Sequence, residues 1–146
     1  MNLINRLIKR RFQIQKIFLR IRGAEIGIGN TFNGWLAVAG DPQNLVIGNH
    51  NVFNEYVVIN CSESIRIGNS NHFSVGSKLI TTKLNSNFSS HQSFPIIIGN
   101  NNWFAVDSVV AVRSAPIYFG DNIVIGAKSL VFSSIFTSGK YYGIIK

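Results

Sequence analysis

The stretch PIIIGNNNWFAVDSVV, residues 95–110, decides the fold, because large apolar residues return in it every six positions. Ile98 is followed by Phe104 and then by Val110. A helix cannot gather residues six apart on one face. A coil of three short strands can, if each strand turns one large side chain inward and Gly, Asn or Asp form the corners. The stretch therefore predicts one coil of a β-helix.

The same pattern occurs five times along the chain. Each copy opens on a triplet of an apolar residue, Gly and Asn or Asp, and the triplets begin at Ile28, Ile47, Ile67, Ile98 and Phe119. Their spacings are 19, 20, 31 and 21 residues, and a second block aligns behind each: FNGWLAV, FNEYVVI, FSVGSKL, FAVDSVV and IGAKSLV. Stacked coils satisfy one another's backbone groups and bury one continuous core. We therefore predict an all-β domain of about five coils over residues 23–146.

Together with FGDNIVIGAKSLV, residues 119–131, the opening stretch resembles the paired coils of the hexapeptide-repeat acyltransferases. The resemblance covers about residues 20–135 and is closest to the maltose, galactoside and exopolysaccharide O-acetyltransferases, including the colanic-acid type. It implies a single-stranded, left-handed parallel β-helix; the hand comes from the resemblance, since ordinary parallel crossovers are right-handed. It also implies acetyl-CoA as the acyl donor and a homotrimer with active sites between subunits. Exposed aromatic residues such as Trp35 and Tyr56 would favour such burial.

One segment, residues 81–96, interrupts the repeat. The 31-residue spacing exceeds its neighbours by about ten residues, and insertions in such stacks collect on the binding face. The segment contains His91, and transfer of an acyl group to a hydroxyl needs a base with a pKa near neutrality. The resembling family carries its catalytic histidine in this loop, which implies that His91 is the general base. The alternative is an ordinary surface histidine.

The resemblance also assigns binding residues. Asn54 takes the place of an asparagine that binds the acceptor, and Trp103 that of a tryptophan at the edge of the active site. Their alternatives are a turn asparagine and an aromatic residue at a coil corner. The coenzyme would lie along the C-terminal coils, where the matching residues are Ala105, Gly126, Ala127 and Lys128.

The sequence departs from the family where the coenzyme phosphates would lie. The family continues with Thr-Lys after its last Ser-Val-Val, whereas this chain has Phe132-Ser133. Lys128 or Lys140 would then have to supply the cation. We expect O-acetylation of a saccharide in surface-polysaccharide assembly. Two alternatives stay open: N-acetylation of an amino-sugar nucleotide, and a catalytically degenerate scaffold.

Metal and nucleophile chemistry have weaker support. A β-helical metalloenzyme of the γ-carbonic-anhydrase kind needs three converging histidines, but His50 and His72 lie at unequal offsets from their triplets. No metal is expected. Cys61, the only cysteine, has neither a disulfide partner nor a placed base, which fits a reducing compartment such as the cytoplasm.

The first 22 residues differ from the rest of the chain. They hold seven of the fourteen Lys and Arg residues and no acid, whereas residues 23–146 hold seven bases and six acids. A phosphate-binding groove needs bases across the folded surface, so nucleic acid is not expected as a partner. Apolar residues recur at steps of three and four, which predicts a basic amphipathic helix over residues 1–22. This helix would cap the open end of the stack, attach to the anionic inner face of the plasma membrane, or do both.

Overall fold

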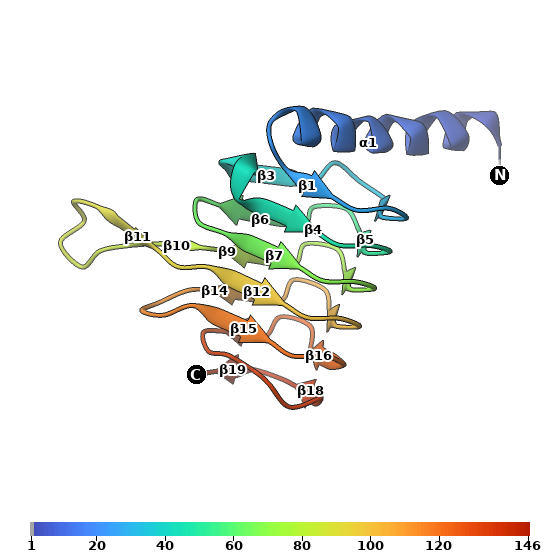
Figure 1. Cartoon of the computed structure of the whole chain (residues 1–146). Helices are drawn as coiled ribbons and strands as arrows, with labels where there is room; N and C mark the ends of the chain where they lie inside the picture. The colour runs from blue at the N-terminus through green and yellow to red at the C-terminus, as the bar shows by residue number, and fades with distance from the viewer. Residues whose placement is uncertain (1) are drawn as a thin grey trace.

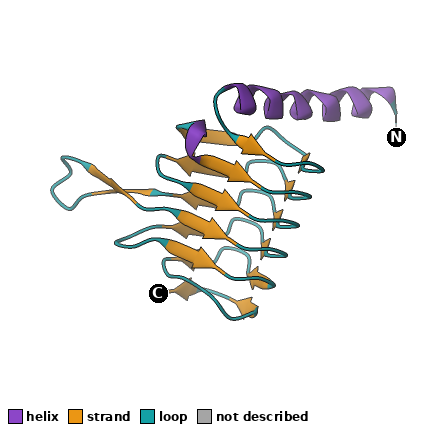
Figure 2. Ribbon diagram, viewed as in Figure 1, coloured by secondary structure: helices purple, strands orange, loops and turns teal. Residues whose placement is uncertain are grey.

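The computed structural model describes residues 2–146 as a β-helix of three parallel sheets with one helix at its N-terminal end (Figures 1 and 2). The first sheet contains β1 (Glu25–Ile26), β4 (Leu45–Ile47), β7 (Ile65–Ile67), β12 (Ile96–Ile98) and β15 (Ile117–Phe119). The second contains β2 (Thr31–Phe32), β5 (Val52–Phe53), β8 (His72–Phe73), β13 (Trp103–Phe104), β16 (Ile123–Ile125) and β18 (Gly139–Tyr141). The third contains β3 (Ala37–Gly40), β6 (Val58–Cys61), β9 (Lys78–Ile80), β14 (Val109–Ala111), β17 (Leu130–Val131) and β19 (Ile144–Ile145).

Successive coils follow a left-handed path. In Figure 1 the chain runs rightward along the front strands, turns behind on the right and returns leftward as it descends from β1 to β19. There are five complete coils and part of a sixth, in which Ile135 bridges to Phe119 before β18 and β19. The predicted fold class is confirmed, with this partial coil added.

The period of six places one large residue of each strand in the core. Ile47, Phe53 and Ile59 of the second coil are all at most 2% exposed. The rings of Phe53, Phe73 and Phe104 form a parallel stack with 4.8 Å between successive centroids. That distance equals the usual spacing of neighbouring strands, so one ring from each coil fills one layer of the core.

Two ladders of polar side chains fix the corner between the first and second sheets. In the buried ladder, the Oδ1 atoms of Asn30, Asn51, Asn71 and Asn102 each accept a backbone N–H from the next coil, at 2.8–2.9 Å. An outer ladder of Asn49, Asn69, Asn100 and Asp121 accepts N–H groups of the preceding coils at 2.6–2.9 Å. Each coil is therefore locked to the next at the same corner.

The buried ladder corrects the predicted start of the first repeat. Ile28 was expected to point inward, but it is 71% exposed, and Ile26 pairs with Ile47 instead. The physical reason is that Asn30 belongs to the buried ladder beside Asn51 and not to the outer ladder beside Asn49. The spacing from the first coil to the second is therefore 21 residues, from 26 to 47.

The N-terminal helix α1 (Leu3–Ile21) covers the open end of the stack. Asn2 caps it by accepting the backbone N–H of Ile4 at 2.7 Å. Only Gln15 and Leu19 of the helix are buried. The Gln15 amide accepts the N–H of Leu36 at 2.9 Å and donates to its carbonyl at 2.5 Å. The helix thus satisfies backbone groups at the edge of the first coil that no further coil would reach.

Basic side chains add to this cover. Lys16 donates to the carbonyl of Asn30, and Arg20 donates to that of Ile26 at 2.8 Å. Burial lowers the pKa of Lys16, and the nearby charge of Arg20 lowers it further. No helix in residues 2–146 has both the length and the apolar character needed to cross a membrane.

The segment expected to leave the repeat forms an antiparallel hairpin of β10 (Thr82–Leu84) and β11 (His91–Ser93). It projects sideways from the middle of the stack (Figure 1). The remaining element is the short 3-10 helix η1 (Pro42–Asn44).

Candidate functional site

A row of polar side chains lies on the outer face of the second sheet. The Asn33 amide donates to Oδ1 of Asn54 at 2.9 Å, and Nδ2 of Asn54 lies 2.9 Å from Nε2 of His72. These residues come from three successive coils and meet because the strands are in register. Asn54 is therefore held on both sides, and its amide has a fixed orientation.

This orientation determines the form of His72. Because Oδ1 of Asn54 accepts from Asn33, its Nδ2 is the group that faces His72 and must donate. Nε2 of the imidazole is then an acceptor, and the proton of the neutral ring lies on Nδ1. The His72 side chain is exposed, so it presents a hydrogen-bond donor at the surface.

Trp103 lies beside His72, because the two residues are register partners on neighbouring strands. Its indole Nε1 donates to the hydroxyl of Ser74 at 2.9 Å, and half of its surface is exposed. The ring is thus anchored at one edge with an open face. Together Asn33, Asn54, His72, Ser74 and Trp103 form what we call the polar platform.

Small residues continue the same outer face toward the C-terminal end. Ala105 and Gly126 occupy equivalent positions in the fourth and fifth coils, directly after Phe104 and Ile125. The residue predictions for acceptor and coenzyme, made separately, therefore fall on one strip. Gly126 is required there, because a Cβ atom would lie 2.2 Å from Cδ1 of Tyr142.

The backbone of the strip limits which groups remain for a ligand. The N–H groups of Ala105 and Gly126 already donate to Ile125 and Tyr141 at 2.9 and 2.8 Å. Within residues 2–146, the N–H of Ala127 donates to no carbonyl or side chain. Ala127 is exposed at the corner, so it is the backbone donor open to a bound molecule.

Lys128 follows at this corner with a backbone φ of 58° or less, in the left-handed region at 57°. Its ammonium group is paired with Asp107 at 3.3 Å, and the side chain is 80% exposed. Such an exposed pair contributes little to stability, and its cation stays accessible to an anion.

A second cation was not found by sequence reasoning. The guanidinium carbon of Arg113 lies 3.3 Å from the ring centroid of Phe132, the residue that replaces the family's Thr-Lys position. Planar stacking of this kind is typical of arginine on an aromatic ring. The signal was hidden because the two residues are 19 positions apart in sequence and become neighbours only when the fourth and fifth coils stack.

His91 lies in the hairpin and not on the polar platform. It is the register partner of Leu84, is exposed, and makes no side-chain hydrogen bond within residues 2–146. In Figure 1 the hairpin projects to the left, whereas β5 and the second sheet lie on the right. One chain therefore does not bring His91 to Asn54 and Trp103.

The other candidate groups stand apart. His50 occupies a turn with a φ of 58°, and no group of three His, Cys, Asp or Glu side chains in residues 2–146 has the arrangement of a metal site. Cys61 is buried, and this burial raises the pKa of its thiol.

No protein-family model and no curated protein matches the sequence. The three sheets nevertheless define a β-helix of the hexapeptide-repeat type. The fold is similar to that of a hexapeptide-repeat acetyltransferase from Vibrio cholerae, with a TM-score of 0.81, 17% identity, and coverage of 91% of this chain and 76% of the other. The same Vibrio cholerae protein in complex with acetyl-CoA gives a TM-score of 0.79 at 17% identity, over 90% of this chain and 72% of the other.

Two further solved structures are similar. A maltose O-acetyltransferase from Clostridium difficile 630 gives a TM-score of 0.75 at 22% identity, over 95% of this chain and 77% of the other. An N-acyltransferase from Bacillus cereus, solved with coenzyme A and dTDP-4-amino-4,6-dideoxyglucose, gives 0.61 at 13% identity, over 88% and 83%. At these identities the similarity establishes the fold. The expected resemblance to hexapeptide-repeat acetyltransferases is confirmed at that level.

Proposed function

We propose that this protein transfers an acetyl group from acetyl-CoA to a hydroxyl of a saccharide, as a step in the assembly of a surface polysaccharide. The observation that carries the proposal is the continuous strip on the second sheet. It runs from fixed amide and imidazole groups beside an open indole face to small residues at Ala105 and Gly126. Sugars bind to such combinations, because hydroxyls pair with amides while the C–H face of the ring packs on an indole.

The coenzyme would occupy the small-residue end of the strip and the corner beyond it. The free N–H of Ala127 is a donor for an amide carbonyl of the pantetheine arm. Lys128 and Arg113 supply cations for the phosphates, with Arg113 held in place by Phe132. Arg113 thus answers the departure at Phe132-Ser133, since the missing lysine is replaced by a guanidinium from the coil before.

The reaction needs one base. The acceptor hydroxyl attacks the thioester carbonyl while His91 removes its proton, and the tetrahedral intermediate then collapses. The carbon–sulfur bond breaks, and the thiolate recovers the proton from His91 to give free coenzyme A and the acetyl ester. Exposure keeps the His91 imidazole available for this exchange.

We propose further that the site is completed between copies of the chain, in a homotrimer. The support is that His91 projects away from its own polar platform, so a neighbouring copy has to receive it. Coexpression tests this. His91→Asn and Asn54→Ala chains should each be inactive alone and should regain part of the activity when mixed, because some sites then combine two intact residues. No recovery in mixed oligomers would contradict shared sites.

The function is tested by following free thiol after addition of acetyl-CoA and saccharide acceptors. His91→Asn should lower the rate by about 10²- to 10⁴-fold. His50→Asn is the matched control, because it makes the same chemical change at a turn whose φ of 58° suits asparagine. Equal rates for wild type and His91→Asn would refute the role of His91.

N-acetylation is the second candidate, favoured by the similarity to the Bacillus cereus N-acyltransferase. The same assay with amino-sugar nucleotides as acceptors separates the two reactions. The remaining alternative is a scaffold without catalysis. Calorimetry decides it, because a scaffold would bind no coenzyme A.

A further inference from the structure

The helix α1 carries two apolar faces, and only one of them contacts the stack. At 100° per residue, Phe12, Gln15 and Leu19 fall within an arc of about 60° on the side facing the coils. A second set falls within an arc of about 100° centred roughly opposite. Its members are between 48% and 75% exposed, and we call them the outer stripe: Leu3, Leu7, Ile14, Ile17, Phe18 and Ile21.

The helix also extends beyond the coils that it covers. In Figure 1 it lies across the end of the stack, and its N-terminal part overhangs. Ile8 shares the helical face of Leu19 but is 46% exposed, because no coil lies beneath it. The stability of the stack therefore does not explain the apolar residues of the first turns.

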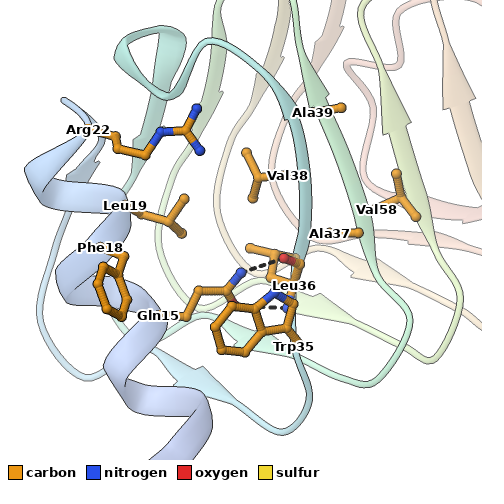
Figure 3. A pocket seen from close by; sticks show the side chains of 10 residues that line it. All are labelled: Gln15, Phe18, Leu19, Arg22, Trp35, Leu36, Ala37, Val38, Ala39 and Val58. Carbon is orange, nitrogen blue, oxygen red and sulfur yellow. Dashed lines mark hydrogen bonds between the residues drawn. The ribbon is translucent and has the colours of Figure 1, made fainter.

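A groove continues this apolar surface onto the coils (Figure 3). It lies between α1 and β3, has a volume of about 530 Å³, and is lined mainly by apolar side chains. Phe18 belongs to both the outer stripe and the groove, and Trp35, which is half exposed, lies on the opposite wall. A half-exposed indole beside an apolar patch is typical of membrane–water interfaces.

The charges around the outer stripe have one sign. Arg6, Lys9, Arg10 and Arg11 make no side-chain hydrogen bond or ion pair within residues 2–146, whereas Lys16 and Arg20 are used to cover the first coil. Residues 1–22 contain no acid. A second copy of α1 packed on the stripe would bring these cations together without compensation, so charge complementarity favours an anionic surface.

We propose that the outer stripe docks on an anionic lipid bilayer. Helix α1 would lie in the plane of the interface with its apolar residues among the lipid chains and its arginines at the headgroups. A flat surface can meet the whole length of the helix, because the stripe faces away from the stack (Figure 1). The β-helix, with the polar platform and hairpin, then points away from the membrane.

Sedimentation of the full chain with vesicles tests this proposal. Binding is expected to vesicles of phosphatidylcholine with 30% phosphatidylserine, and not to pure phosphatidylcholine. The triple change Arg6→Gln, Arg10→Gln, Arg11→Gln should weaken binding about 100-fold, taking about fivefold for each cation. The matched control removes the same charge from the body at Arg66, Lys83 and Lys146 and should bind within a few-fold of wild type.

A second variant removes the apolar part of the surface. The triple change Leu7→Ser, Ile14→Ser, Ile17→Ser should release the protein from the vesicles while its circular dichroism and melting temperature stay close to wild type, because these side chains do not contact the coils. The proposal is overturned by wild-type protein that ignores the anionic vesicles, or by helix variants that bind like wild type. It is equally overturned if the Arg66, Lys83, Lys146 control loses as much, or if light scattering shows that the helix variants reduce the oligomer mass instead of vesicle binding.

Discussion

Replacing Asn71 by alanine should cost far more stability than the same change at Asn69. The Asn71 side chain donates to Oδ1 of Asn51 at 3.1 Å and to the carbonyl of Gly99 at 2.9 Å, and it accepts the N–H of Asn102 at 2.9 Å. Alanine leaves that N–H without a partner inside the protein and the carbonyl only partly accessible to water. An unpaired buried group costs about 1–3 kcal/mol, so the loss should be about 3–4 kcal/mol, or roughly 10 °C in melting temperature.

Asn69→Ala is the matched control, since Asn69 occupies the outer ladder. Its side chain accepts a single N–H, that of Asn49 at 2.8 Å, at an exposed position where water replaces the lost partner. We expect a loss of about 1 kcal/mol or less. Urea or thermal unfolding followed by circular dichroism measures both variants. If they unfold together, the buried ladder does not stabilise the stack in the way its hydrogen bonds imply.

Three further outcomes are expected. Cys61 should react with iodoacetamide at least about 100-fold more slowly in the folded than in the unfolded chain, because it is buried; since burial raises the pKa of its thiol, its contribution to folding stability should fall as the pH rises above the unfolded value of 9.0, which unfolding of wild type and Cys61→Ala across that range would reveal. Arg113→Gln should weaken coenzyme A binding about tenfold by calorimetry, roughly 1–2 kcal/mol, whereas Arg113→Lys should lose less, and equal affinity in all three proteins would remove Arg113 from the phosphate site. Gly48→Ala should destabilise the fold by about 1–3 kcal/mol in urea unfolding, because its Cβ would lie 2.4 Å from the carbonyl oxygen of Gly68, and a wild-type midpoint would show that the corner can widen.

The core could be read from the sequence because one physical rule governs it. A period of six can only place Ile47, Phe53 and Ile59 in one interior if the chain coils in three short strands, and all three are buried. The first repeat failed for a different reason. Ile26 and Ile28 both precede a glycine, so the apolar pattern fits either register, and the hydrogen bonds of Asn30 to the next coil decide between them.

The site was harder to predict than the core, because its neighbours come from different coils. Asn54 and Trp103 were identified one at a time, and the sequence gave no sign that His72 lies between them. His72 sits at a different offset from its triplet than His50, which made it look like an ordinary turn residue. In the fold it is in register with Trp103 and within 2.9 Å of Asn54. Small errors of register decide such contacts, whereas the core tolerates them.

The hairpin and α1 leave the stack in different directions, and this separation allows catalysis and membrane docking to be independent. The hairpin emerges from the middle of the stack, whereas α1 covers its end (Figure 1). A trimer that shares His91 between copies uses the sides of the β-helix. Provided the copies stack side by side with parallel axes, their outer stripes face the same way and reach one plane together. Three weak attachments to the same bilayer then act as one strong attachment, because the second and third helices bind at high effective concentration. A single helix whose apolar stripe is only partly exposed would thus suffice to hold the assembly at a membrane.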